Sequence, residues 1–381
     1  MMIQARKPIS TVLIKPAGPD CNMDCSYCFY LDKASLFGAS EKHRMTDELL
    51  EETIRQTMQQ SGHSVSLAWQ GGEPTLMGLG FFRRAAELQK QYGAGKLVEN
   101  SLQTNGILLD KKWAAFLREN NWLVGMSLDG PREIHDRYRV DRGENATHAR
   151  VEENARMLLS QGVQANAMCV VTSHSVNFPD ELYHYFKELG YKYMHFIPIQ
   201  ERDEDDPGKP ASYSVSARDY GEFLIRMFDL WAADFENGMP GTSLNLFETL
   251  LYPYVGLPSP NCTLNRACGN YVVVEHNGDV YSCDFFVEPQ WKLGNIGQHR
   301  ILDMLNSEKQ NTFGSSKGRL PDACMKCRWL SKCYGGCLKD RRNNTQNKDR
   351  TAFCGSHKMF FEHADPVLEQ MALKLSANTM Q

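Results

Sequence analysis

The spacing of the cysteines constrains this chain more than any other feature. Three of them, Cys21, Cys25 and Cys28, form a C-x3-C-x2-C motif near the start, and eight more lie from Cys262 to Cys354. A chain of 381 residues buries enough surface to fold without disulfide staples. Clustered thiols in a reducing compartment more often bind metal. The sequence therefore predicts metal centres near both ends of the chain.

Charge and hydropathy argue against several classes of protein. Lys and Arg number 42 against 46 Asp and Glu, so the net charge of −4 gives no basic face for nucleic acid or a membrane surface. No apolar run approaches the roughly 18 residues needed to span a bilayer. The first ten residues contain Arg6, Lys7 and Pro8 but no apolar core, so no signal peptide is predicted. We expect a cytoplasmic protein that binds neither nucleic acid nor membranes.

Strand-like and helix-like segments alternate over the first 236 residues. The expected strands are residues 11–15, 65–69, 97–103, 122–127, 163–171 and 193–197. The expected helices are residues 46–60, 81–92, 110–120, 147–161, 179–189 and 217–236. Six β-α units imply a parallel sheet with helices outside, either doubly wound or a partial barrel.

The regular pattern fades after residue 236. Residues 237–260 contain four prolines and three glycines, which favours a connecting segment. We therefore predict a first domain at 1–236, a connection at 237–260 and a cysteine-dense second domain at 261–381. Short strands are expected in that domain around 271–275 and 280–283.

The first cysteine motif directly follows the first predicted strand. Three thiolates on one compact loop can hold three irons of a four-iron cluster, which leaves the fourth iron open to a small molecule. The structural alternative is a zinc ion bound by the same cysteines and by His43.

The next three predicted strands also end in small polar motifs. These are Gln70-Gly71-Gly72-Glu73-Pro74, Gln103-Thr104-Asn105-Gly106 and Ser127-Leu128-Asp129-Gly130. Glycine after a strand lets the backbone approach a ligand closely. Glu73 can accept hydrogen bonds from an ammonium, and Asn105 and Ser127 can bind a ribose or a carboxylate. Because α/β folds place their chemistry at the carboxyl ends of strands, we expect a ligand site there.

Eight thiols in the C-terminal segment are enough to ligate two further four-iron clusters. They are Cys262, Cys268, Cys283, Cys324, Cys327, Cys333, Cys337 and Cys354. Two zinc ribbons are the alternative, because C-x2-C pairs commonly bind zinc. The twelfth cysteine, Cys169, lies in a predicted strand, and we expect an inert core thiol there.

Together these motifs resemble the radical S-adenosylmethionine (SAM) superfamily. Cys21, Cys25 and Cys28 followed by Phe29 match its cluster loop, and Gly71-Gly72-Glu73-Pro74 matches its methionine-binding motif. The resemblance implies an α/β fold of the partial (β/α)6, TIM-like barrel type, a four-iron cluster, and SAM cleaved to a 5′-deoxyadenosyl radical. The cofactor-binding residues it implies are Gly71, Gly72, Glu73, Asn105, Ser127 and Arg139.

The C-terminal cysteines resemble the SPASM domain of peptide-modifying radical enzymes. The matching pattern is Cys268-x9-Gly278-x4-Cys283, then Cys324-x2-Cys327-x5-Cys333-x3-Cys337, then Cys354. The resemblance implies two auxiliary clusters, one held by Cys262, Cys268, Cys283 and Cys337, the other by Cys324, Cys327, Cys333 and Cys354. Spacing alone leaves this pairing open.

Longer motifs resemble the anaerobic sulfatase-maturating enzymes. They are Leu13-Ile14-Lys15-Pro16-Ala17-Gly18, the cysteine loop continued through Phe29-Tyr30-Leu31, Trp69-Gln70-Gly71-Gly72-Glu73-Pro74-Thr75-Leu76, Asn100-Ser101-Leu102-Gln103-Thr104-Asn105-Gly106 and Tyr281-Ser282-Cys283-Asp284-Phe285. The resemblance implies oxidation of a cysteine or serine of a sulfatase to Cα-formylglycine. It assigns Asp284 as the base, and Tyr30 and Gln70 to substrate binding.

The same resemblance implies the partners and the course of the reaction. The substrate is an unfolded or nascent sulfatase polypeptide, and the electron donor is a protein such as flavodoxin or ferredoxin. The radical removes a Cβ hydrogen, the base takes a proton, and an electron leaves through the nearby auxiliary cluster. One alternative is a sibling enzyme that cross-links or epimerises a ribosomal peptide. Another is a non-catalytic electron-transfer protein, which would have no need of an open iron site.

Overall fold

The computed structural model describes residues 6–38, 42–236, 239–347 and 349–378. The fold divides into two compact units, and each is built from separate stretches of sequence. The first comprises Met1–Ser127, Asp136–Ala165 and Gly269–Gly314, and the second comprises Leu128–His135, Asn166–Cys268 and Ser315–Gln381. The domain boundaries at residues 236 and 261 stay a prediction. Residues 1–5 of the N-terminal segment, where no signal peptide is predicted, and residues 237–238 of the predicted connection lie outside the described residues.

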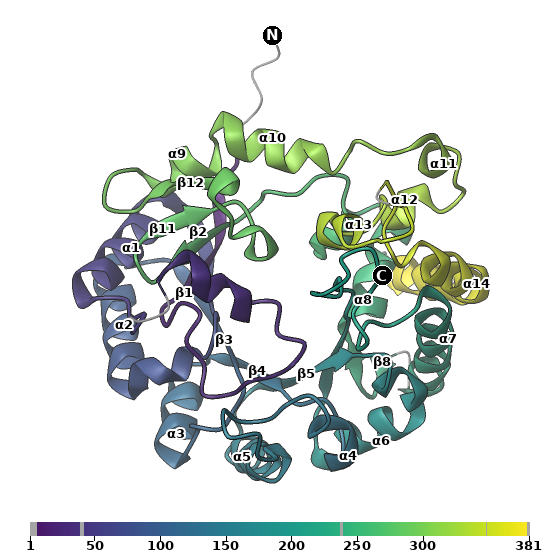
Figure 1. Cartoon of the computed structure of the whole chain (residues 1–381), viewed down its shortest axis with the longest axis horizontal. Coiled ribbons are helices and arrows are strands. Elements are labelled where there is room, and N and C mark those ends of the chain that lie inside the picture. Colours follow the sequence, from purple (N-terminus) through teal and green to yellow (C-terminus); the bar gives the residue numbers. More distant parts are fainter. Residues whose placement is uncertain (1–5, 39–41, 237–238, 348, 379–381) are drawn as a thin grey trace. The chain divides into compact units, whose positions relative to one another are not determined.

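The first unit contains four consecutive parallel strands, as the sequence predicts (Figure 1). They are β1 (Ile9–Lys15), β2 (Ser61–Trp69), β3 (Leu97–Thr104) and β4 (Leu123–Ser127), paired in chain order. The helices of this unit include α1 (Asp47–Gln60), α2 (Gly78–Tyr92), α3 (Lys111–Glu119) and α5 (His148–Ser160). Thr46 caps the N-terminus of α1, since its Oγ1 accepts a hydrogen bond from the Leu49 amide. Asp110 caps α3 in the same way.

Three later strands extend this sheet beyond β1. The sequence predicts the first two, near residues 271–275 and 280–283, but not that they pair with β1. β10 (Val272–Glu275) pairs with β1 in parallel, followed by antiparallel β11 (Asp279–Tyr281) and β12 (Lys292–Asn295). The physical reason lies in β1, where Val12 and Ile14 are fully buried. A strand of this kind cannot remain an open edge, because its peptide groups would lack partners. The register places Lys15 opposite Glu275.

The second unit contains the parallel strands β5 (Ala165–Val171, whose first residue belongs to the first unit), β6 (Tyr193–Pro198) and β9 (Ser243–Leu244). Its main helices are α6 (Pro179–Leu189), α7 (Ala217–Ala233), α8 (Asn245–Tyr254) and α14 (Cys354–Asn378). α8 falls where the sequence pattern fades. Its Phe247 ring packs on Phe228 of α7 and Phe360 of α14, so tertiary contacts stabilise a helix that periodicity does not reveal.

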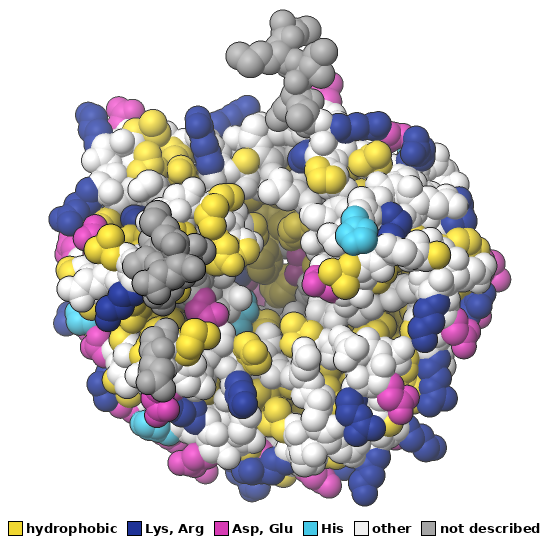
Figure 2. All heavy atoms as spheres, turned by 180° about the vertical axis from the view of Figure 1, so that it is seen from behind, with side chains coloured by type: hydrophobic (Ala, Val, Ile, Leu, Met, Phe, Trp, Pro, Cys, Tyr) yellow, Lys and Arg dark blue, Asp and Glu magenta, His cyan; other side chains and the backbone are white. Residues whose placement is uncertain are grey.

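These observations confirm the predicted α/β class with a mostly parallel sheet. Within the described residues, no helix is long and apolar enough to cross a bilayer. On the face drawn in Figure 2, basic and acidic side chains are interspersed, in keeping with the near balance of 42 and 46 charges.

Candidate functional site

The three cysteines of the first motif lie on a loop that follows β1. The Cys28 amide donates to the Cys25 carbonyl at 2.9 Å, and the Met23 amide lies 3.4 Å from Cys21 Sγ. The loop runs beside residues 138–140, because the Asp24 amide donates to the Val140 carbonyl at 2.9 Å. Main-chain bonds therefore hold the loop in place at the carboxyl end of the sheet.

Gly71 and Gly72 allow the loop after β2 to pack against the loop after β1. The Gly72 amide donates to the Gly18 carbonyl at 2.8 Å, and the Glu73 amide donates to the Asp20 carbonyl at 2.7 Å. A Cβ atom on Gly72 would lie only 2.1 Å from that Asp20 oxygen, and Gly71 has φ of +130°. The ligand-binding role that the sequence predicts for these glycines stays a prediction, and in the structure they make room for the chain that carries the cysteines.

Glu73 is buried and held by four donors. Its Oε1 accepts from the Thr75 amide at 2.9 Å, from the Thr75 hydroxyl at 2.5 Å and from Thr104 Oγ1 at 2.8 Å. Its Oε2 accepts from the Asn105 amide at 2.7 Å and keeps a lone pair for a further donor. Burial raises the pKa of Glu73. Burial, and then the Glu73 carboxylate, raise the pKa of Cys21 to about 12, so this thiol stays protonated unless a metal binds.

Asn105 connects the end of β3 with the cysteine loop. Its Nδ2 donates to Asn22 Oδ1 at 2.8 Å and lies 3.6 Å from Cys21 Sγ. Ser127 is the last residue of β4. Because β4 pairs in parallel with β3, Ser127 and Asn105 lie at the same edge of the sheet. Arg139 is buried, with its guanidinium carbon 5.4 Å from the ring centre of Tyr27 on the cysteine loop. Of the predicted cofactor residues of this unit, Glu73, Asn105 and Arg139 thus lie against that loop or the residues that lead into it.

A second buried group forms around Lys15 at the end of β1. The side chain of Lys15 is 1% exposed and makes an ion pair with Asp284. Its ammonium lies 3.4 Å from the ring centre of Tyr30, and the Tyr30 hydroxyl donates to Glu275 Oε1. The pairing of β10 with β1 therefore brings the predicted base and a predicted substrate-binding residue together. The sequence reasoning missed Lys15 and Glu275 as members of this group.

The surroundings of Tyr30 define its charge state, and the chain around Asp284 defines its neighbours. Burial, followed by the Glu275 and Asp284 carboxylates, raises the pKa of Tyr30 well above its usual value, so its phenol stays a donor. Asp284 directly follows Cys283, whose sulfur lies 3.3 Å from the Tyr271 hydroxyl. Gln70 directly follows β2, and its amide donates to the Ile14 carbonyl of β1 at 3.0 Å.

In the second unit, one buried lysine lies near three of the predicted cluster cysteines, and its ammonium donates to the Cys262 carbonyl at 2.6 Å. Lys317 interacts electrostatically with Cys262, Cys268 and Cys337. Burial raises the pKa of Cys268 to about 11, and Lys317 opposes this rise. Cys283, the fourth thiol assigned to this group by resemblance, belongs to the first unit.

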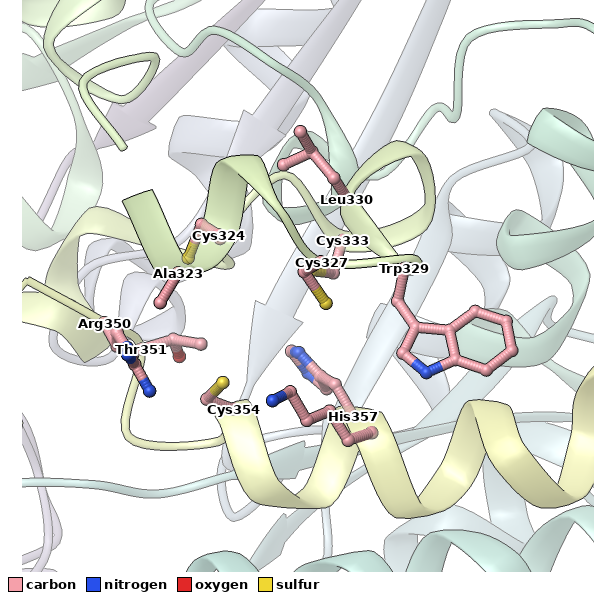
Figure 3. Close-up of a pocket in the computed structure, with 12 residues that line it drawn as sticks. Ala323, Cys324, Cys327, Trp329, Leu330, Cys333, Arg350, Thr351, Cys354 and His357 are labelled. Atoms are coloured by element: carbon pink, nitrogen blue, oxygen red, sulfur yellow. The ribbon is translucent and has the colours of Figure 1, made fainter. Parts of the chain in front are cut away.

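Four more of the predicted cluster cysteines in this unit line one cavity (Figure 3). They are Cys324 of α11 (Asp322–Met325), Cys327, Cys333 of α12 (Leu330–Cys333) and Cys354, which begins α14. His357 also lines it, and its buried Nδ1 has no hydrogen-bond partner in the structure, as expected beside a bound group that accepts a hydrogen bond. Burial lowers the pKa of His357 to about 4, so the ring is neutral near pH 7. The lining therefore fits an anionic iron–sulfur cluster.

Two minor expectations can be compared with the structure. The Nδ1 atom of His43 is not free to bind a zinc ion at the cysteine loop, because it lies 2.7 Å from Asp20 Oδ1. Within the described ranges, no three histidine, cysteine or carboxylate side chains gather closely enough to share a single metal ion. Cys169 is 1% exposed in β5, which confirms the buried core thiol.

Comparison with known proteins agrees with this geometry. Residues 16–190 match the radical SAM superfamily, and residues 262–328 match the SPASM iron–sulfur cluster-binding domain. A serine-type anaerobic sulfatase-maturating enzyme of Bacteroides thetaiotaomicron is 38% identical, covering 96% of this chain and 91% of its own length. A cysteine-type enzyme of Clostridium perfringens is 39% identical, covering 96% and 99%.

Solved structures give the same result for the fold. Native anSMEcpe with bound AdoMet and the Cp18Cys peptide matches with a TM-score of 0.87 and 37% identity, over 97% of this chain and 100% of that chain. SuiB of Streptococcus suis, bound to its precursor peptide, is similar in fold alone, with a TM-score of 0.63 and 16% identity. The expected radical SAM and SPASM domains are therefore confirmed, and the chain belongs to the anaerobic sulfatase-maturating enzymes.

Proposed function

We propose that this chain oxidises a cysteine or serine of a sulfatase polypeptide to Cα-formylglycine. The observation that carries the proposal is the buried group in which Asp284, Lys15 and Tyr30 meet at the end of β1. Tyr30 is two residues beyond Cys28, at the end of the cysteine loop. The Asp284 carboxylate, which is suited to proton transfer, therefore belongs to the same compact unit as that loop. An electron carrier would have no use for a base held in this way.

The cofactors are a four-iron cluster with SAM, and additional iron–sulfur clusters in the SPASM domain. Cys21, Cys25 and Cys28 would hold the first cluster, and Gly71, Gly72, Glu73, Asn105, Ser127 and Arg139 would surround SAM. The auxiliary clusters would take the eight later thiols in the two groups named above. When bound, these groups supply the radical that removes a Cβ hydrogen and an acceptor for one electron.

The remaining chemistry is the transfer of one proton, and Asp284 would accept it. A CH2–SH group that loses a hydrogen atom, a proton and an electron becomes a thioaldehyde, and water then releases hydrogen sulfide to leave the aldehyde. A serine gives the aldehyde directly. Lys15 holds the Asp284 carboxylate in place through its ion pair, and the ring of Tyr30 packs against the Lys15 ammonium. Gln70, at the end of the neighbouring strand, would bind the substrate backbone.

We also infer a cytoplasmic enzyme that acts on an unfolded or nascent sulfatase and is reduced by a protein such as flavodoxin or ferredoxin. The discriminating experiment is anaerobic incubation with SAM, a reductant and peptides carrying C-x-P-x-R or S-x-P-x-R, followed by mass spectrometry. Formylglycine in either peptide, and none in an A-x-P-x-R control, is the expected result. An intramolecular cross-link or an epimerised residue without aldehyde would instead favour a sibling peptide-modifying enzyme.

A further inference from the structure

Lys317 is a fully buried cation whose direct partners are all main-chain carbonyls. Its ammonium donates to the Cys262 oxygen at 2.6 Å, to the Thr263 oxygen at 2.9 Å and to the Asn265 oxygen. Carbonyls satisfy the three N–H groups, but they do not neutralise the charge. A buried charge without an opposite charge is costly, so this ammonium requires an anion nearby.

The hydrogen bonds of Lys317 identify where that anion belongs. Its ammonium binds the main chain of Cys262 itself, and Arg341, which donates to the Lys317 carbonyl, also donates through its amide to the Cys337 carbonyl at 3.1 Å. Burial lowers the pKa of Lys317, and the thiols of Cys268, Cys262 and Cys337 act to raise it. Lys317 therefore belongs to the surroundings of three cysteines that resemblance assigns to one cluster. As neutral thiols they offer no compensation, whereas as thiolates bound to iron they offer it directly.

A second buried cation increases the need for an anion at this place. The guanidinium of Arg341 donates to the carbonyls of Gly335 at 2.9 Å, Tyr334 at 2.9 Å and Lys317 at 2.8 Å. Its charge acts against that of Lys317. Two buried like charges in one region destabilise a fold unless a negative group lies with them.

A four-iron cluster bound by thiolates is such a negative group, and reduction adds one further negative charge to it. We propose that Lys317 is the counter-ion of the auxiliary cluster held by Cys262, Cys268 and Cys337, and that its ammonium raises the reduction potential of that cluster. The inference rests on the proposed assignment of the cysteines to clusters. It adds a residue that sets how readily this cluster accepts an electron.

The effect should be specific to one of the two auxiliary clusters. Cys324, Cys327, Cys333 and Cys354 share a cavity whose lining includes Arg350 but not Lys317. Lys317 instead acts on the other set of thiols. Removing the charge of Lys317 should therefore change the reduction potential of one auxiliary cluster and leave that of the other unchanged.

The test compares three variants of the full chain after anaerobic reconstitution. Lys317→Gln keeps N–H donors without charge, Lys317→Met removes both, and Lys317→Arg keeps the charge. Lys187→Met, which breaks an ion pair with Asp234 in the same unit, is the control for a lost lysine. Iron and sulfide content and the midpoint potentials of the clusters, followed by EPR, are measured for each.

We expect Lys317→Gln and Lys317→Met to favour the oxidised form of one auxiliary cluster by about tenfold, a shift of about 59 mV for one electron. Lys317→Arg and Lys187→Met should match the wild type. If the uncharged variants lose that cluster while the arginine variant keeps it, the charge is needed to hold the cluster, which also supports the role.

Two results would overturn the counter-ion role. One is full iron content with unchanged potentials in Lys317→Gln or Lys317→Met. The other is equal cluster loss in all three variants, which would make hydrogen-bond geometry the determining factor. Failure of the underlying assignment looks different, because wild-type protein would then contain only about four irons, enough for the one cluster of the N-terminal loop.

Discussion

Replacing Asp284 with asparagine tests the role of its carboxylate as the base. From the structure, we expect the same substitution to lower the stability of the folded protein. Asparagine keeps the shape of the side chain but cannot accept the substrate proton, so the yield of formylglycine should fall by at least about a hundredfold. The same change leaves the ammonium of Lys15, whose side chain is only 1% exposed, without its partner. Breaking a buried pair from one side costs about 3–5 kcal/mol.

A double variant separates the two effects. Lys15→Met with Asp284→Asn removes both charges, so most of the lost stability should return, because replacing a whole buried pair is often nearly neutral. The oxidation of peptide should stay at the level of the single Asp284→Asn variant. Thermal unfolding gives the stability side of this double-mutant cycle, and mass spectrometry of the peptide gives the catalytic side. Release of 5′-deoxyadenosine in the same samples reports whether SAM cleavage is retained.

The result that would refute this reasoning is specific. An Asp284→Asn protein as stable as the wild type would contradict the buried ion pair, and near-normal peptide oxidation would rule out Asp284 as the base. If the clusters are lost together with activity in the single and the double variant, the role of Asp284 is structural.

Three further substitutions test the cysteine loops and the packing between them. Cys25→Ala should abolish SAM cleavage, because two thiolates cannot hold the catalytic cluster; near-normal 5′-deoxyadenosine would contradict this assignment. Cys327→Ala should lower iron content and thermal stability through the cavity of Figure 3, since cluster binding is coupled to folding, and unchanged values would contradict that coupling. Gly72→Ala places a Cβ 2.1 Å from the Asp20 oxygen, so the cysteine loop must shift by about 1 Å, which should slow SAM cleavage about a hundredfold. Gly80→Ala, with no atom within 4 Å of the new Cβ, is its control and should leave the rate unchanged.

The sequence predicts the surroundings of the cysteine loop well because they follow from strand order. Parallel strands end at one edge of a sheet, so motifs that follow successive strands must meet. Cys21, Glu73 and Asn105 do meet there, through the amide and side-chain bonds of Asn105.

The group around Lys15 could not be predicted in this way. It depends on β10 pairing with β1 in one register, and those strands lie far apart in the sequence. No local pattern specifies such a long-range pairing. The signal that was present is Lys15 itself, a charged residue at the end of an otherwise apolar strand, which requires a buried partner. The role of Gly72 was hidden for the same reason, since its close neighbour, the Asp20 carbonyl, lies on another loop.

The most direct test of the central claim is to follow the hydrogen that the radical removes. A C-x-P-x-R peptide carrying two deuterium atoms at the cysteine Cβ is incubated anaerobically with the enzyme, SAM and reductant. The account predicts formylglycine that retains one deuterium, together with 5′-deoxyadenosine that carries the other. A 5′-deoxyadenosine without deuterium, or deuterium acquired only from a peptide labelled at Cα, would contradict it.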